Sequence, residues 1–240
     1  MPWWYAVAER DHELQNPTSE DKIRLLGERL RLGPESRVLD VASGKCGPAL
    51  VLAAAFGCRI VAVERSPEFV AAARERVHAA GLGERIEIHE ADGSEFPLGR
   101  EGFDAALCLG ASFVWNGLDA TLEALTPAVR PGGHVVVGEP YWRRWPLPTG
   151  VADDGFVPLG ETAARLDAAG LEVVTIIASS EDDWDTYESL HWRAVTEWLH
   201  ENPGDGDAED FRRRHAEYRA HYLTVQRELL GWAIFAGRRP

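Results

Sequence analysis

The sequence predicts an α/β protein with a seven-stranded, mostly parallel sheet that is doubly wound, so that helices cover both of its faces. Three observations predict this class. Short apolar runs alternate with helix-forming segments through the first 140 residues, which is typical of a parallel sheet. Two further apolar runs near the C-terminus are separated by about fifty helix-like residues, so we expect these two closing strands to pair at the sheet edge, with the last strand antiparallel. The length of 240 residues suits a single domain.

Local signals define the individual elements. An amphipathic helix is expected over 18–32, where apolar residues recur at helical spacing behind Ser19. Ser66-Pro67-Glu68 combines a cap residue, a proline and an acid at the start of a helix that ends near Gly81. The remaining helices are expected at 48–56, 119–129 and 161–169, and the strands at 37–41, 59–63, 85–89, 103–109, 134–137, 171–178 and 230–235.

Composition and sequence patterns disfavour some binding partners and some cellular compartments. The formal charge of −14 disfavours nucleic acid as a partner, because phosphate binding needs clustered cations. Cys46, Cys58 and Cys108 form no C-x-x-C pair, which argues against a disulfide framework, and we expect no metal site. There is no signal-peptide pattern and no run of 18 apolar residues, so we expect a cytoplasmic protein that does not contact a membrane.

The glycine-rich loop after the first strand, residues 42–47, is the most informative motif. A P-loop is excluded, because Leu39 stands where it needs glycine and Cys46 where it needs serine or threonine. Ala42-x-Gly44-x-x-Gly47 matches a dinucleotide-binding fingerprint with one alanine substitution. The same loop also fits, less regularly, the loop that binds S-adenosylmethionine (SAM) in methyltransferases. Taken alone, the loop leaves both hypotheses open.

Acidic residues at three successive strand ends favour the second hypothesis. Asp40 precedes the glycine-rich loop, Glu64 ends the second strand and Asp92 follows the third. An acid before the loop would repel a pyrophosphate at the next helix N-terminus, where anions normally bind. It would instead attract the ammonium group of SAM. The three acids therefore favour a cationic cofactor without phosphates.

With these motifs in place, the sequence resembles the class I SAM-dependent methyltransferases over about residues 20–140. The resemblance is carried by V-L-D-V-A-S-G-x-x-G, V-A-V-E, E-A-D-G, F-D-A-A-L-C-L-G and R-P-G-G-H-V-V-V-G-E-P. The segments Glu139-Pro-Tyr-Trp142 and Trp184-Asp-x-Tyr187-Glu are similar to a bacterial subgroup of small-molecule methyltransferases. The resemblance implies a Rossmann-like fold, SAM as cofactor and S-adenosylhomocysteine (SAH) as product.

The resemblance also implies a cofactor-binding set. The family pattern puts the methionine end of SAM near the loop, the ribose at the second strand end, the adenine at the third and the floor after the fourth. In this sequence the corresponding residues are Asp40, Ala42, Ser43, Gly44, Gly47, Glu64, Arg65, Asp92, Gly93, Gly110 and Ala111. Ala42 and Cys46 stand where the family has glycines, so a slightly wider loop is expected.

The acceptor site is predicted from strand ends and from a lid. The chain is divided into an N-terminal arm (1–33), a cofactor core (34–140) and a lid insertion (about 180–229). Methyl transfer needs an aligned nucleophile and, for a protonated acceptor, a base. Candidate catalytic residues are Glu139, Tyr141, His12 and His191, and candidate acceptor-pocket residues are Trp115, Trp142, Tyr187 and Trp192.

The nine tryptophans support this division. None lies between residues 5 and 114, which should hold the cofactor, so several are expected to wall the acceptor pocket. The sequence thus predicts methyl transfer from SAM to a small molecule, with the accepting atom unresolved. A Rossmann-type NAD(P)-dependent oxidoreductase and a non-catalytic SAM-binding protein are the alternatives.

Overall fold

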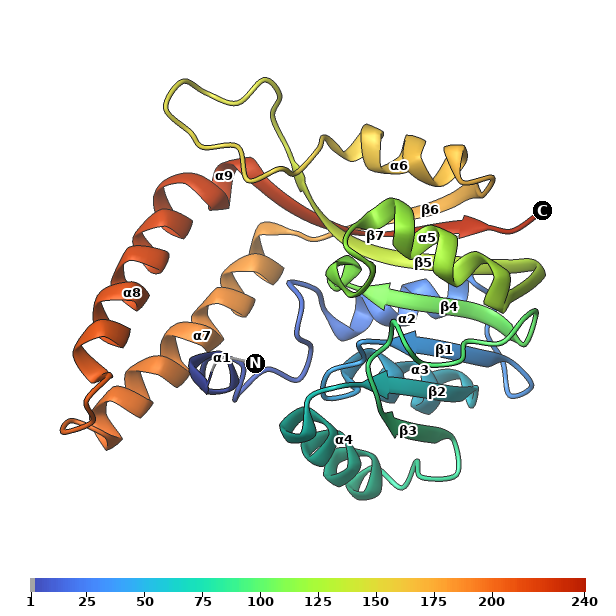
Figure 1. Cartoon of the computed structure of the whole chain (residues 1–240), viewed down its shortest axis with the longest axis horizontal. Helices are drawn as coiled ribbons and strands as arrows, with labels where there is room; N and C mark the ends of the chain where they lie inside the picture. Colours follow the sequence, from blue (N-terminus) through green and yellow to red (C-terminus); the bar gives the residue numbers. More distant parts are fainter. Residues whose placement is uncertain (1–2) are drawn as a thin grey trace.

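A seven-stranded mixed sheet forms the centre of the molecule in the computed structural model, which describes residues 3–240 (Figure 1). The strand order is β3-β2-β1-β4-β5-β7-β6, and β7 runs antiparallel to both of its neighbours. This arrangement confirms the predicted fold class. The strands are β1 (Arg37–Val41), β2 (Arg59–Glu64), β3 (Ile86–Glu90), β4 (Phe103–Leu109), β5 (Val129–Trp142), β6 (Glu172–Ala178) and β7 (Leu230–Arg238).

Helices cover both faces of the sheet, because side chains along each central strand point alternately to opposite sides. On β1, Val38 packs with the helices of one face and Leu39 with those of the other, and both are fully buried. The first face carries α2 (Glu20–Arg29), α3 (Gly47–Phe56) and α4 (Pro67–Ala79), and the second carries α5 (Leu118–Leu125) and α6 (Leu159–Ala168). Short 3₁₀ turns occupy Ser112–Trp115 and Thr126–Ala128.

A helical excursion connects β6 to β7 and lies to one side of the sheet (Figure 1). It consists of α7 (Glu181–Glu201), α8 (Ala208–His221), a π-helical turn (Tyr222–Gln226) and α9 (Arg227–Leu229). Ser180 and Asp183 form a reciprocal capping box that starts α7. The N-terminal helix α1 (Trp3–Ala8) packs on α7, with the Trp3 and Trp198 ring centroids 4.9 Å apart. Segments from the two ends of the chain thus lie together.

The fifth strand is longer than the sequence predicts. The expected strand covered residues 134–137, whereas β5 continues to Trp142, because β7 pairs with it as far as the Trp142–Leu230 register. Glu139, Tyr141 and Trp142 therefore lie within the strand and not in a loop beyond it.

Within residues 3–240, no helix combines the length and the apolar character needed to cross a membrane.

Candidate functional site

A first cavity opens at the carboxyl ends of β1, β2 and β4 and measures about 330 Å³. This is the edge at which doubly wound sheets bind ligands. All the predicted cofactor-binding residues line it except Asp92. The lining residues are Tyr5, Gln15, Asn16, Asp40, Ala42, Ser43, Gly44, Gly47, Pro48, Val63, Glu64, Arg65, Phe69, Ala91, Gly93, Leu109, Gly110, Ala111, Phe113 and Val114.

The loop between β1 and α3 adopts a backbone that favours glycine, even where glycine is missing. Ala42 and Cys46 have φ values of 56° and 58°, and Gly44 between them has 56°. Residues with a Cβ rarely adopt this left-handed region, which costs them about 1–2 kcal/mol. The two departures from the family pattern therefore leave the loop in a glycine-like conformation.

Asp40 and Glu64 give this cavity a negative end. Asp40 is 3% exposed, and its Oδ2 has no hydrogen-bond partner among residues 3–240. Burial, and secondarily the charge of Glu64, raise the pKa of Asp40 to about 7. Glu64 accepts hydrogen bonds from the backbone N–H groups of Gly44 (2.9 Å) and Ser66 (2.8 Å). A cationic group beside Asp40 would supply the partner that its carboxylate lacks.

Asp92 follows β3 as expected, but its carboxylate does not line the first cavity and instead forms hydrogen bonds with Ser94. It accepts hydrogen bonds from the backbone N–H (2.9 Å) and hydroxyl (2.6 Å) of Ser94 and lies 3.6 Å from Arg65. Its neighbours Ala91 and Gly93 do line the cavity. An Asp-Gly turn after a strand explains this geometry, because the aspartate side chain bonds to backbone two residues on.

The N-terminal segment contributes three residues to the lining of the first cavity that the sequence did not predict: Tyr5, Gln15 and Asn16. Gln15 accepts a hydrogen bond from the Lys45 backbone N–H (2.7 Å), and Asn16 donates to the Leu109 carbonyl (3.2 Å). A Cβ on Gly44 would lie 2.0 Å from Gln15, and a Cβ on Gly110 would lie 2.1 Å from Asn16. The absence of a side chain at these two glycines therefore leaves the space that the N-terminal arm occupies. Nothing in the local sequence of the arm signals this long-range contact.

A second cavity of about 410 Å³ lies between α1, α7 and α8. Its walls are mainly aromatic and aliphatic, with a few polar groups, which is typical of small-molecule sites. Tyr5 lines both cavities. The residues lining the second cavity are Trp4, Tyr5, Ala8, Glu9, Tyr187, His191, Val195, Phe211, Arg214, His215 and Tyr218.

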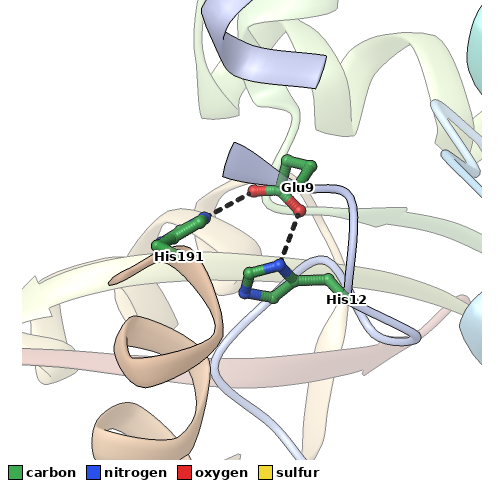
Figure 2. A group of neighbouring side chains, drawn as sticks. All are labelled: Glu9, His12 and His191. Carbon is green, nitrogen blue, oxygen red and sulfur yellow. Dashed lines mark hydrogen bonds and ion pairs between the residues drawn. The ribbon is translucent and has the colours of Figure 1, made fainter. Parts of the chain in front are cut away.

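Buried Glu9 joins His12 and His191 beside the second cavity (Figure 2). Its Oε1 lies 3.0 Å from Nε2 of His191 and accepts a hydrogen bond from the Tyr187 hydroxyl at 3.1 Å. Its Oε2 faces Nδ1 of His12 at 3.7 Å. The sequence predicted both histidines as catalytic candidates but did not identify Glu9, which lies 182 residues from His191.

The pKa values of these three side chains are shifted from their ordinary values. Burial alone would lower the pKa of His191, but Glu188 and Glu9 outweigh it and raise the pKa to about 9. Burial would raise the pKa of Glu9, but His191, His12 and Tyr187 hold it below its ordinary value. The pKa of His12 is lowered, mainly by burial. Such opposed shifts are typical of functional sites and of buried ion-pair networks alike.

The other predicted catalytic and acceptor-pocket residues lie elsewhere. Glu139 is half-buried within β5, where burial raises its pKa to about 7, and neither it nor Tyr141 lines the first or the second cavity. The predicted pocket tryptophans take part in packing: Trp142 contacts Phe156, Trp192 contacts Tyr222, and Trp115 packs against the buried cluster that contains the leucines of α5. Of the predicted pocket residues, only Tyr187 lines the second cavity.

Comparison with known proteins gives consistent results. Residues 38–133 match a family model described as a methyltransferase domain. The uncharacterized protein YjhP of Escherichia coli K12 is 30% identical, and the alignment covers 98% of each chain. A SAM-dependent methyltransferase from Thiobacillus denitrificans, crystallised with SAH, is 31% identical and superposes with a TM-score of 0.94, over 100% of this chain and 99% of that one. A SAM-dependent methyltransferase from Geobacter sulfurreducens, also with SAH, shows the same identity, coverage and TM-score.

Proposed function

This chain belongs to the class I SAM-dependent methyltransferases, and on that premise we propose that it methylates a small molecule held in the second cavity. The observation that carries the proposal is the position of Tyr5, which lines both cavities. An acceptor in the second cavity would therefore lie next to a cofactor in the first.

The residues of the first cavity fit SAM. Asp40 is buried, its Oδ2 has no hydrogen-bond partner among residues 3–240, and it would bind the ammonium group of the methionine portion. Glu64 at the end of β2 would face the ribose, and the loop at 42–47 would lie along the methionine chain. When bound, SAM supplies an electrophilic methyl group. The protein's task is then to hold the two reactants in line and to exclude water.

The second cavity fits a small acceptor with an apolar body and one polar end. Trp4, Phe211 and Tyr218 supply flat apolar surface, whereas His191 and Glu9 supply polar groups at one wall. His191 would face the acceptor, and His12 would act through Glu9 as a positioning residue, because His12 does not line the cavity. This arrangement leaves Glu139 and Tyr141 without a proposed role in catalysis.

A calorimetric titration with SAH tests the cofactor half of the proposal. The purified chain should bind SAH, and Glu64→Ala should weaken binding at least about tenfold, because it removes a buried charged hydrogen-bond acceptor. Absence of SAH binding by the unsubstituted protein would refute the proposal.

Filling the second cavity tests the acceptor half. SAH production from SAM is measured with a panel of small phenols, amines, thiols and carboxylates. Ala8→Phe places a large side chain in the cavity, so it should abolish turnover of the accepted compound and leave SAH binding intact. Ala71→Phe, on the exposed face of α4, is the matched control and should keep both. SAH binding with no turnover of any compound would favour a non-catalytic SAM-binding protein.

A further inference from the structure

The side chains of Glu9, His12 and His191 have the composition of a metal-binding site. One ligand atom from each lies within 4.8 Å of the other two (Figure 2). Two imidazoles and a carboxylate are ligands that divalent first-row transition metals accept. We propose that these three residues bind one such ion at the wall of the second cavity. The inference does not depend on which molecule accepts the methyl group.

The spacing of the donor atoms suits direct coordination. Metal–ligand bonds of about 2.0–2.1 Å at tetrahedral angles put neighbouring ligand atoms about 3.3 Å apart. Nε2 of His191 lies 3.0 Å from Glu9 Oε1, and Nδ1 of His12 lies 3.7 Å from Glu9 Oε2. The three ligand atoms lie within 4.8 Å of one another, so the side chains would have to close by up to about 1.5 Å around a bound ion.

Two of the three ligands, His12 and Glu9, also have an outer hydrogen-bond partner that orients them. Nε2 of His12 donates a hydrogen bond to the Tyr187 carbonyl at 2.9 Å, which leaves Nδ1 as a lone-pair donor aimed at Glu9. Nδ1 of His191 faces a second buried carboxylate, that of Glu188, at 3.9 Å. The Tyr187 hydroxyl holds Glu9 Oε1. Metal-ligating histidines almost always donate their other ring N–H to a carbonyl or a carboxylate. His12 does so, whereas Nδ1 of His191 lies beyond hydrogen-bonding distance of Glu188.

Two buried atoms of the group face each other without a proton between them. With the Nε2–H of His12 committed to the Tyr187 carbonyl, neutral His12 presents only a lone pair to Glu9 Oε2. Neither atom has a hydrogen-bond partner among residues 3–240. Buried polar atoms are rarely left unpaired. A cation between them satisfies both.

The ion would keep open positions toward the second cavity. Glu9 and His191 line that cavity, so three protein ligands leave room there for water or for an oxygen of a bound molecule. A metal with three protein ligands and an open position is typical of catalytic sites, where it polarises or deprotonates a bound oxygen. The ligand class that this site selects is thus a small molecule with a hydroxyl, enol or carboxylate oxygen.

Binding of Co²⁺ to the tag-free, chelator-treated protein tests the proposal. Co²⁺ bound by two imidazoles and a carboxylate gives visible d–d absorption, and we expect saturation at one ion per chain. His12→Ala and His191→Ala should each weaken binding at least about tenfold. His78→Ala removes an exposed imidazole on α4, away from the second cavity, and should leave binding unchanged. SAH binding by every variant reports that the fold is intact.

The position of the ion gives a readout that does not depend on any variant. In crystals of the unsubstituted protein grown with Co²⁺, the anomalous peak should lie about 2.0–2.2 Å from Glu9, His12 and His191. No stoichiometric Co²⁺ binding by the unsubstituted protein would overturn the proposal. So would a peak at other residues, or affinity that the two histidine variants leave unchanged; the group would then be a hydrogen-bond network only.

Discussion

Among single residues, Asp40 is the one whose burial most clearly disfavours the ionised form that would bind a cationic ligand. An ionised carboxylate is costly in an apolar environment, and Oδ2 of this one has no hydrogen-bond partner among residues 3–240. Burial, with Glu64, raises its pKa from 3.8 to about 7 in the folded chain. Because the folded state holds the proton more tightly than the unfolded state, the stability gained from Asp40 is fully present below about pH 4 and is lost as the pH rises through about 7. This loss is reduced when a cation binds beside the carboxylate.

SAH binding should therefore depend on pH. The ligand's ammonium group prefers ionised Asp40, so SAH affinity should rise with pH, by up to about tenfold per unit below pH 7, and level off above it. Calorimetric titrations between about pH 5.5 and 8.5 measure this slope. Asp40→Asn should weaken binding at high pH and flatten the profile, whereas Asp182→Asn, at an exposed position on α7, should preserve it. A flat profile for the unsubstituted protein would show that Asp40 does not contact the ligand.

At the scale of elements, the start of α3 depends on the arm that crosses it. Gly47, the first residue of α3, has ordinary backbone angles, so its glycine is not required by φ. Glycine is needed at this position for steric reasons, because a Cβ there would lie 2.2 Å from the Glu13 carbonyl oxygen. Backbone cannot rotate away as a flexible side chain can. The contact thus fixes the path of the arm that carries Gln15 and Asn16 into the first cavity.

Gly47→Ala should displace this arm. We expect the free energy of unfolding to fall by about 1–3 kcal/mol, as for overpacking elsewhere, and SAH affinity to fall with it. Urea unfolding and calorimetry measure the two effects. Gly160→Ala is the matched control: it lies in the first turn of α6 with no atom within 4 Å of the added Cβ. That variant should be neutral or slightly stabilised. Equal stability of the two variants would exclude the steric explanation.

For the whole molecule, the sequence predicts what local patterns encode and misses what distant segments build together. The alternation of strands and helices predicts the sheet, because each signal spans a few neighbouring residues. The family resemblance, carried by short motifs at the strand ends, predicts ten of the twenty residues that line the first cavity. The second cavity has no such signal. Glu9 and His191 meet only because α1 packs on α7. For the same reason Trp4, from the arm, lines this cavity, whereas Trp115, Trp142 and Trp192 do not.

The arm also links the two cavities, which leads to a prediction for the molecule as a whole. Gln15 and Asn16 line the first cavity, and buried Lys45 of the β1–α3 loop donates through Nζ to the carbonyl of Glu9 (2.7 Å), beside the second. A ligand that orders the loop should therefore order the arm and the α7 residues packed on it. In hydrogen–deuterium exchange followed by mass spectrometry, SAH should slow exchange in residues 5–17 and around Tyr187 as well as in 40–47.

Residues 159–168 of α6, on the opposite face of the sheet, are the internal reference and should exchange at an unchanged rate. Protection restricted to 40–47 and 64–66 would mean that the two cavities are energetically independent, since a ligand orders only the segments whose contacts it strengthens. Protection that extends through the arm to α7 would mean that binding in the first cavity prepares the second. The acceptor would then meet a preformed aromatic wall, and more of its binding energy would remain for alignment with the methyl group.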